Sequence, residues 1–359
     1  MTPNTPTATD QPTNPVEAVR HLSPYPYYEA LAGRPPWFDE GLGMWIVADA
    51  HDVVALLNCE AAKVRPVGEP CPGHLNATAA GETIQRIVRM NDGPEHQRIR
   101  DTVDAWFASL TPARVEEACE KARDSVRSQN SDLRLMDQWM RTYPCAVMVL
   151  LMGINADATA SLTAAAQALA DAFGPGAGAD TTNAANEAVT TIVDALDEPR
   201  KVMANVAAGL VFQTFDATAA LIGNTIAHLA RHSSGARDER HVAVTIDHVL
   251  RFDPAVHNTR RFLDADITIG NLTITAGSTV LLVLAAANID SARPHQLDTV
   301  AFGAGPHKCP ADKLAVSIAR HGVTAIIDAY GEEPLPVPAS YSPRQNSRIP
   351  VFTTDRTDP

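Results

Sequence analysis

The sequence predicts a mainly α-helical fold with a small β part. Three observations predict it. Residues 94–252 carry a mostly helical apolar pattern, the stretch from about 199 to 231 is apolar nearly all round, and two short alternating runs flank Gly270 and Asn271. The sequence lacks the alternation of strands and helices that would indicate a Rossmann sheet.

The N-terminal third predicts a tail followed by a first strand and helix. Residues 1–15 are mostly Thr, Pro and Asn, so we expect a disordered tail there and a single domain over 16–359. Residues 43–57 predict a short strand, an Asp-rich turn and then a helix.

The central part predicts a series of helices. Pro112 opens a helix whose apolar stripe recurs every three or four residues, and a second helix covers roughly 134–152. The glycine-rich stretch 174–183 breaks two Ala-rich helices and predicts a mobile loop.

The stretch 199–231 predicts one long helix through the interior, about 45 Å in length. Its few polar members therefore stand out: Gln213, Thr214, Asp216 and Thr218. After it we expect a short helix over 245–252 and a β-hairpin with its turn at Gly270 and Asn271.

Composition excludes several classes of function. The chain has 359 residues, with 29 Lys and Arg against 42 Asp and Glu, a net charge of −13, which argues against nucleic acid or an anionic membrane as partner. We find no uncharged apolar run long enough for a transmembrane helix and no secretory signal. Five scattered cysteines suit a reducing cytosol, so we expect a cytoplasmic protein.

The segment 302–320 carries the strongest chemical signal. Two glycines and a proline precede Cys309, and an apolar helix follows it. Glycine allows tight turns and close approach of a flat ligand, and free N–H groups at a helix start can hydrogen-bond a thiolate. These residues leave three roles open for Cys309: a nucleophile, a metal ligand or an inert buried thiol.

The run Phe302 to Cys309, FGAGPHKC, resembles the haem-binding loop FGxGxHxC of the cytochrome P450 family. Ala311 stands where the family usually has a glycine two residues after the cysteine. Other segments agree in order: 91–100 is similar to the start of the family's C helix, 219–231 to the end of its I helix, and 249–290 to its K helix and following sheet. The resemblance covers roughly residues 25–355 and implies a shortened cytochrome P450-like fold.

The resemblance implies haem b, iron protoporphyrin IX, with Cys309 as the axial ligand of the iron. Thiolate ligation favours O–O cleavage. Phe302 and Gly303 belong to the cofactor-binding loop. The implied partners of the haem propionates are His96, Arg100, Arg261 and His307, because buried carboxylates need charge-assisted donors.

Two departures affect the region behind the loop. The family's K helix carries Glu-x-x-Arg, whereas here His248 stands three residues before Arg251. A neutral His is a weaker hydrogen-bond partner for Arg than a carboxylate, so we expect the Cys309 loop to be held less firmly than in the family. The segment between Asn288 and Phe302 is also short and lacks the family's PxRF stretch, for which Arg293 is the candidate substitute.

A third departure lies in the long helix. Asp216 occupies the family's acidic position, but Ala217 replaces the hydroxyl that helps to deliver protons, with Thr218 one place further on. One residue turns a helix by about 100°, so Thr218 is not a simple substitute. Asp216 and Thr218 are the candidate catalytic residues. Gln213 and Phe215 are candidates for the substrate pocket, with core packing as the alternative for Phe215.

The resemblance implies a haem-thiolate monooxygenase that takes electrons from a ferredoxin and oxidises a small organic substrate, in secondary metabolism. The altered long helix keeps a second function open, a haem-thiolate enzyme with peroxide-driven, coupling, isomerisation or dehydration chemistry. The altered K helix and short segment keep a third open, a haem-free protein that activates a partner enzyme.

Overall fold

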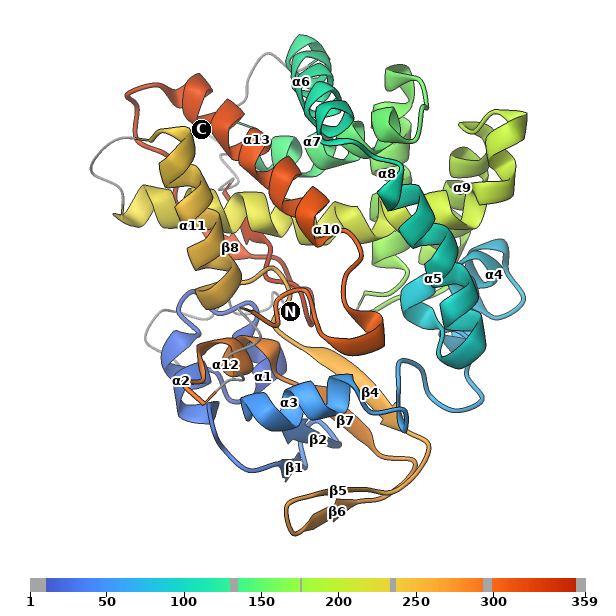
Figure 1. The fold of residues 1–359 in the computed structure, drawn as a ribbon, viewed down its shortest axis with the longest axis vertical. Coiled ribbons are helices and arrows are strands. Elements are labelled where there is room, and N and C mark those ends of the chain that lie inside the picture. Colours follow the sequence, from blue (N-terminus) through green and yellow to red (C-terminus); the bar gives the residue numbers. More distant parts are fainter. Residues whose placement is uncertain (1–10, 130–134, 175, 233–236, 293–298, 353–359) are drawn as a thin grey trace. The chain divides into compact units, whose positions relative to one another are not determined.

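Helices dominate the architecture, and the strands are few and short (Figure 1). The predicted mainly α fold with a small β part is confirmed. The chain folds into two compact units: the first holds residues 1–70, 247–309 and 340–349, and the second holds 71–246, 310–339 and 350–359. The computed structural model describes residues 11–129, 135–174, 176–232, 237–292 and 299–352.

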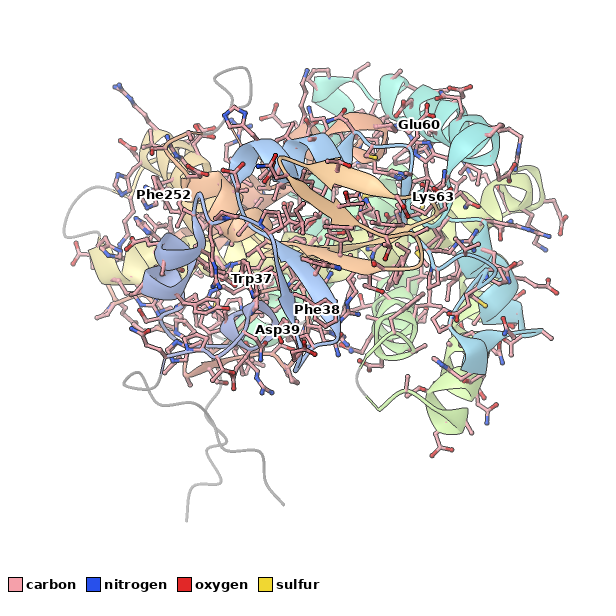
Figure 2. All side chains as sticks on the ribbon, turned by 90° about the horizontal axis from the view of Figure 1, so that it is seen from below. Trp37, Phe38, Asp39, Glu60, Lys63 and Phe252 are labelled. Carbon is pink, nitrogen blue, oxygen red and sulfur yellow. The ribbon has the colours of Figure 1, made fainter. Side chains whose placement is uncertain are left out.

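A five-stranded sheet forms the centre of the first unit. Its strands lie in the order β1-β2-β7-β4-β3, with β2 parallel to β7 and the other neighbours antiparallel. Figure 2 labels residues at its two edges, Trp37 to Asp39 on β1 and Lys63 on β3. The strands are β1 (Trp37–Asp39), β2 (Met44–Val47), β3 (Ala62–Lys63), β4 (Thr259–Leu263) and β7 (Thr279–Leu282).

Two sequence predictions in this unit are confirmed. β5 (Ile267–Ile269) and β6 (Leu272–Ile274) pair as an antiparallel hairpin, and Gly270 takes the positive φ of 57° that its turn needs. β2 leads into α3 (Ala50–Leu57), where the Asp49 carboxylate accepts hydrogen bonds from two N–H groups of the first turn.

Short helices cover this sheet, and the first begins earlier than expected. α1 (Pro15–Ala18) is capped by Asn14, whose side chain accepts hydrogen bonds from the N–H groups of Val16 and Glu17. Structure therefore begins before the predicted boundary at residue 16, while residues 1–10 of the expected tail lie outside the described residues. The remaining helices of this unit are α2 (Tyr25–Leu31), α12 (Leu284–Ile289) and the 3₁₀ turn η5 (Gly305–His307).

A buried arginine ties distant parts of the first unit together. Arg348 is fully buried, and its guanidinium donates to the Asp253 carboxylate (2.8 Å) and to the carbonyls of Val19, His21 and Leu22. Every one of these contacts joins residues more than ninety positions apart. The network therefore holds the N-terminal helices to the chain that follows α11 (Glu239–Phe252), whose last six residues belong to this unit.

The second unit is a bundle of helices. Its connection between α8 and α9 is shorter than the predicted loop 174–183, because α9 begins at Ala179, where the Thr181 hydroxyl accepts a hydrogen bond from the Gly178 N–H. The helices are α4 (Ala79–Gln85), α5 (Gly93–Ala108), α6 (Pro112–Gln129), α7 (Met136–Leu151), α8 (Thr159–Asp171), α9 (Ala179–Asp194), α10 (Ala204–His232) and α13 (Asp312–Tyr330). The 3₁₀ turns are η1 (Gly73–Leu75), η2 (Val88–Met90), η3 (Ala156–Ala158) and η4 (Glu198–Met203), and the short strands β8 (Ser340–Tyr341) and β9 (Pro350–Val351) belong to the first and second unit respectively.

The long helix α10 is the core of this bundle, with α7, α8 and α13 packed along it (Figure 1). Small residues allow the close crossings: a Cβ at Gly322 on α13 would lie 3.0 Å from Ile222 and from Tyr143. Among the described helices, α10 alone has the length and apolarity to cross a membrane, but 67% of that stretch is buried inside the protein. The predicted interior helix over 199–231 is confirmed, with 198–203 as a 3₁₀ turn before it.

Candidate functional site

The Cys309 loop is closed by its own backbone. The Cys309 N–H donates to the Phe302 carbonyl (2.8 Å), and the Lys308 N–H donates to the Gly305 carbonyl (3.0 Å). α13 begins three residues after the cysteine. The loop therefore fixes the backbone of Cys309, whose residue is partly exposed.

Two glycines permit this loop. Gly303 and Gly305 take positive φ angles of 71° and 66°, which side chains other than glycine rarely adopt. A Cβ at Gly305 would lie 2.6 Å from the Asn58 side-chain oxygen and 2.8 Å from the Leu57 carbonyl. The end of α3 therefore packs directly against the loop backbone, and only glycine fits at position 305.

The loop is also anchored in the apolar core of the first unit. Val300 is fully buried and Ala304 is 5% exposed, and both belong to one cluster with Leu57, Val280 and Leu282. The segments on either side of Gly303 are thus held by α3 and by the central strand β7.

Behind the loop lies a hydrogen-bonded group that we name the Asn288 clamp: Asn288, Thr299 and the Leu250 carbonyl. The Asn288 amide donates to Leu250 O (3.1 Å), and its oxygen accepts from the Val300 N–H (2.7 Å) and the Thr299 hydroxyl (3.0 Å). The Thr299 hydroxyl also lies 3.1 Å from Leu250 O. The clamp joins the end of α11 to the residues that enter the Cys309 loop.

His248 and Arg251, the residues aligned with the family's Glu-x-x-Arg, are not part of the Asn288 clamp. His248 and Arg251 are both exposed on α11 and flank the Phe252 ring, His248 at 4.6 Å between ring centroids and Arg251 at 5.1 Å. Arg293 lies outside the described residues. The sequence singled out the altered pair but gave no signal for Asn288 or Thr299, because an Asn after three alanines has no distinctive spacing.

Two of the candidate propionate partners belong to the first unit. Arg261 on β4 is 5% exposed, and its Nη1 donates to two neutral oxygens, the Thr259 hydroxyl (3.2 Å) and the Arg260 carbonyl (2.9 Å). His307 is half-buried within η5. A buried guanidinium and an imidazole beside the cysteine are donors of the kind that a carboxylate needs.

The other two candidates lie on α5 in the second unit. His96 is 5% exposed. Arg100 forms an ion pair with Asp104 one turn later, with its Nε 2.8 Å from each carboxylate oxygen. Arg100 is therefore already neutralised on its own helix in this structure.

The middle of α10 holds the remaining candidates. Asp216 and Gln213 are half-buried, and the Gln213 amide donates to the Gly209 carbonyl (3.0 Å). Thr218 is 4% exposed and Phe215 is 1% exposed, with the Arg141 guanidinium 5.9 Å from the Phe215 ring. The structure thus places Phe215 and Thr218 in the core of the second unit, and Asp216 and Gln213 on a more open part of the helix.

The residues of the first unit fit a haem ligand. A cysteine sulfur stands on a loop with a fixed backbone, glycine is sterically required at position 305 of that loop, and the buried Arg261 can donate to an acidic group. An inert core thiol needs none of these features. The structure holds a further sulfur of the inert kind in Cys145, which is 2% exposed and whose pKa burial raises to about 11.

Comparisons with known proteins point to one group. Cytochrome P450 123 of Mycobacterium tuberculosis is 25% identical, over 88% of this chain and 89% of its own length. P450BioI, solved in complex with an acyl carrier protein ligated to hexadec-9Z-enoic acid, superposes with a TM-score of 0.74 at 18% identity, covering 91% of this chain and 96% of that one. The chain is a relative of the bacterial cytochromes P450. Its fold is the cytochrome P450 fold.

A third comparison agrees with this fold. A structure described as one of the unusual cytochrome P450-like monooxygenases involved in microbial secondary metabolism has a TM-score of 0.69 at 17% identity, over 92% of this chain and 97% of that chain. No protein-family model matches the sequence. At the level of the family, cytochromes P450 are haem oxidoreductases that act on small molecules with a redox partner.

Proposed function

We propose that this protein is a haem-thiolate monooxygenase that oxidises a small organic substrate. The observation that carries the proposal is the Cys309 loop, whose sequence FGAGPHKC is held by backbone hydrogen bonds and by the close contact between Gly305 and α3. Cys309 would bind the iron of haem b. Bound in this way, the haem supplies the chemistry of O–O cleavage, which thiolate ligation favours.

The chain's own residues supply orientation and proton movement. Arg261 and His307 would donate to the haem carboxylates, and the family resemblance assigns His96 and Arg100 the same role. The Asp216 carboxyl would hold and pass a proton, since α10 is partly open at this residue. Thr218 would act from the buried side of the same helix, and Gln213 and Phe215 would shape the substrate pocket.

The proposed redox partner and cellular location rest on the same resemblance. A ferredoxin would supply electrons, and the protein would work in the cytoplasm. The solved relative described as taking part in microbial secondary metabolism supports a role of that kind here. The excess of acidic residues supports the absence of a nucleic-acid partner.

One observation favours a second function. Ala217 stands where the family has a hydroxyl, and Thr218 points its short side chain into a buried part of α10. A haem-thiolate enzyme that uses peroxide, or that couples, isomerises or dehydrates its substrate, would need less proton delivery from the residues of α10. The haem-free auxiliary protein is disfavoured, because it would need neither Gly305 nor the closed loop around Cys309.

The test is turnover under two supplies of oxidant. The purified protein is offered a library of small organic compounds, once with ferredoxin, reductase and O₂, and once with H₂O₂. Products that form only with ferredoxin and O₂ support the monooxygenase. Products that form only with H₂O₂ support the second function, and a protein that binds no haem contradicts both.

A further inference from the structure

Two histidines lie one turn apart at the end of the long helix. α10 ends at His232, and His228 lies four residues earlier on the same helix. Residues at this spacing share one face of a helix and are separated by about 6 Å along its axis. The two imidazole rings are stacked, with centroids 4.4 Å apart and planes 26° apart. Rings this close can contact one small ligand together.

A hydrogen bond fixes which nitrogen of the His232 ring carries the proton. The Nδ1 of His232 lies 3.0 Å from the carbonyl oxygen of His228. A carbonyl oxygen only accepts hydrogen bonds, so Nδ1 is the donor, and Nε2 of the neutral ring keeps its lone pair. Histidines that bind metals almost always hold their other ring nitrogen in a hydrogen bond of this kind. The exposed His232 therefore presents the nitrogen that a metal ion needs.

The half-buried His228 can supply a second nitrogen. An imidazole has two nitrogens, so one can keep a hydrogen bond within the protein while the other binds a metal. A metal–nitrogen bond is about 2.0–2.1 Å long, so two nitrogens that share one ion lie at most about 4 Å apart. The spacing of the two rings suits this distance. The torsion that turns each ring about its Cβ–Cγ bond is soft, so the stacked planes can tilt toward a common ion.

The position at the end of a helix also favours a cation. The last carbonyl groups of a helix lack intrahelical partners, and the helix dipole places partial negative charge there. Arg231 in the same turn acts against a second cation, but it is exposed, so water and salt screen its charge. Among the described residues, no group of three or more His, Cys, Asp or Glu side chains is placed to hold a metal. A site here therefore has two imidazole ligands, with water in the other positions.

We propose that His228 and His232 together bind one divalent transition-metal cation of the nickel, copper or zinc type at the C-terminal end of α10. Imidazole nitrogen suits these ions, whereas Mg²⁺, Ca²⁺ and Mn²⁺ prefer carboxylate, carbonyl and water oxygens. The site uses none of the residues assigned to the haem or to the substrate. The inference therefore goes beyond the proposed function and does not rest on it.

The test is equilibrium dialysis of the full chain, purified without an affinity tag, against Ni²⁺ and separately against Mn²⁺ at neutral pH. The variants are His228→Gln and His232→Gln. The matched control is His51→Gln, which removes an exposed histidine on α3 that has no histidine four residues before or after it. Circular dichroism checks that each variant keeps its helix content. If the half-buried His228 is needed for folding, the exposed His232 alone decides the test.

We expect His228→Gln and His232→Gln each to raise the dissociation constant for Ni²⁺ by about tenfold or more, because even the hydrogen-bond partners of metal ligands contribute that much to affinity. His51→Gln should match the wild type. The wild type should bind Mn²⁺ about tenfold or more weakly than Ni²⁺, since its ligands are imidazoles. A change of less than about twofold for Ni²⁺ in His232→Gln overturns the proposal, and the two rings are then only a stacked pair that caps the helix. Equal binding of Ni²⁺ and Mn²⁺ by the wild type also overturns it, because carboxylates would then be the ligands.

Discussion

Replacing Asn288 with alanine should loosen the Cys309 loop while leaving the rest of the fold intact. Asn288 is fully buried, and with described residues it makes three hydrogen bonds, one to Leu250 O and two from Val300 N–H and the Thr299 hydroxyl. The variant removes all three. It also leaves the buried Val300 N–H without this acceptor.

The magnitude follows from these contacts. The bonds to Leu250 O and the Thr299 hydroxyl contribute about 1 kcal/mol each, and the orphaned Val300 N–H costs about 1–3 kcal/mol, so we expect the free energy of unfolding to fall by roughly 3–5 kcal/mol. Thr299→Val removes one hydroxyl, which donates to Asn288 and accepts from the Ala301 N–H, and it retains the Asn288 bonds to Leu250 and Val300. We therefore expect a smaller loss for it, about 1–2 kcal/mol.

The assay is urea-induced unfolding followed by circular dichroism, together with the rate of haem loss at pH 7. Asn183→Ala is the control, because Asn183 is exposed on α9 and should change the free energy of unfolding by less than about 0.5 kcal/mol. Haem loss should be faster in Asn288→Ala than in the control. If Asn288→Ala is as stable as Asn183→Ala and holds haem as well, the clamp has no role in presenting Cys309.

Two further predictions concern the first unit. Gly305→Ala should lower the free energy of unfolding by about 3 kcal/mol or more, because the new Cβ meets Leu57 and Asn58 and the backbone is left-handed. Gly270→Ala, which has open space around it, should lower it by only about 1–2 kcal/mol. Equal losses of the two variants in urea unfolding would contradict the close contact at Gly305. Burial raises the pKa of Asp253, but the Arg348 charge and the contacts with His257 and Tyr25 together outweigh it and lower that pKa to about 2, below the ordinary 3.8. The carboxylate therefore stabilises the fold above pH 4 and loses this effect as the pH falls toward 2, so the advantage of the wild type over Asp253→Asn in urea unfolding should shrink by roughly 2 kcal/mol across that range. An advantage that stays constant from pH 4 to pH 2 would contradict this assignment.

The elements that could be predicted from the sequence are those with strong local signals. The apolar run around α10, the turn at Gly270 and the Asp-rich turn before α3 each depend on neighbouring residues, and the structure confirms all three. The glycines of the Cys309 loop could also be identified from the sequence, because their spacing to the cysteine is fixed along the chain.

The features that the sequence did not indicate depend on contacts between distant residues. Asn288 becomes a clamp only because α11 ends beside it in space, thirty-eight residues away along the chain. The weaker hold on the Cys309 loop that we expect from His248 is likewise inferred from local sequence. In the structure, the Asn288 clamp contacts the residues that enter this loop, and its side chains form no sequence motif.

The absorption spectrum of the reduced, CO-bound protein tests the central claim most directly. Wild type should bind haem and show the Soret band typical of thiolate ligation, and Cys309→Ala should lose that band while Cys145→Ala, a change at a buried thiol, should keep it. A protein without haem, or a Cys309→Ala variant whose band is unchanged, would contradict the assignment of the Cys309 sulfur as the ligand of the iron.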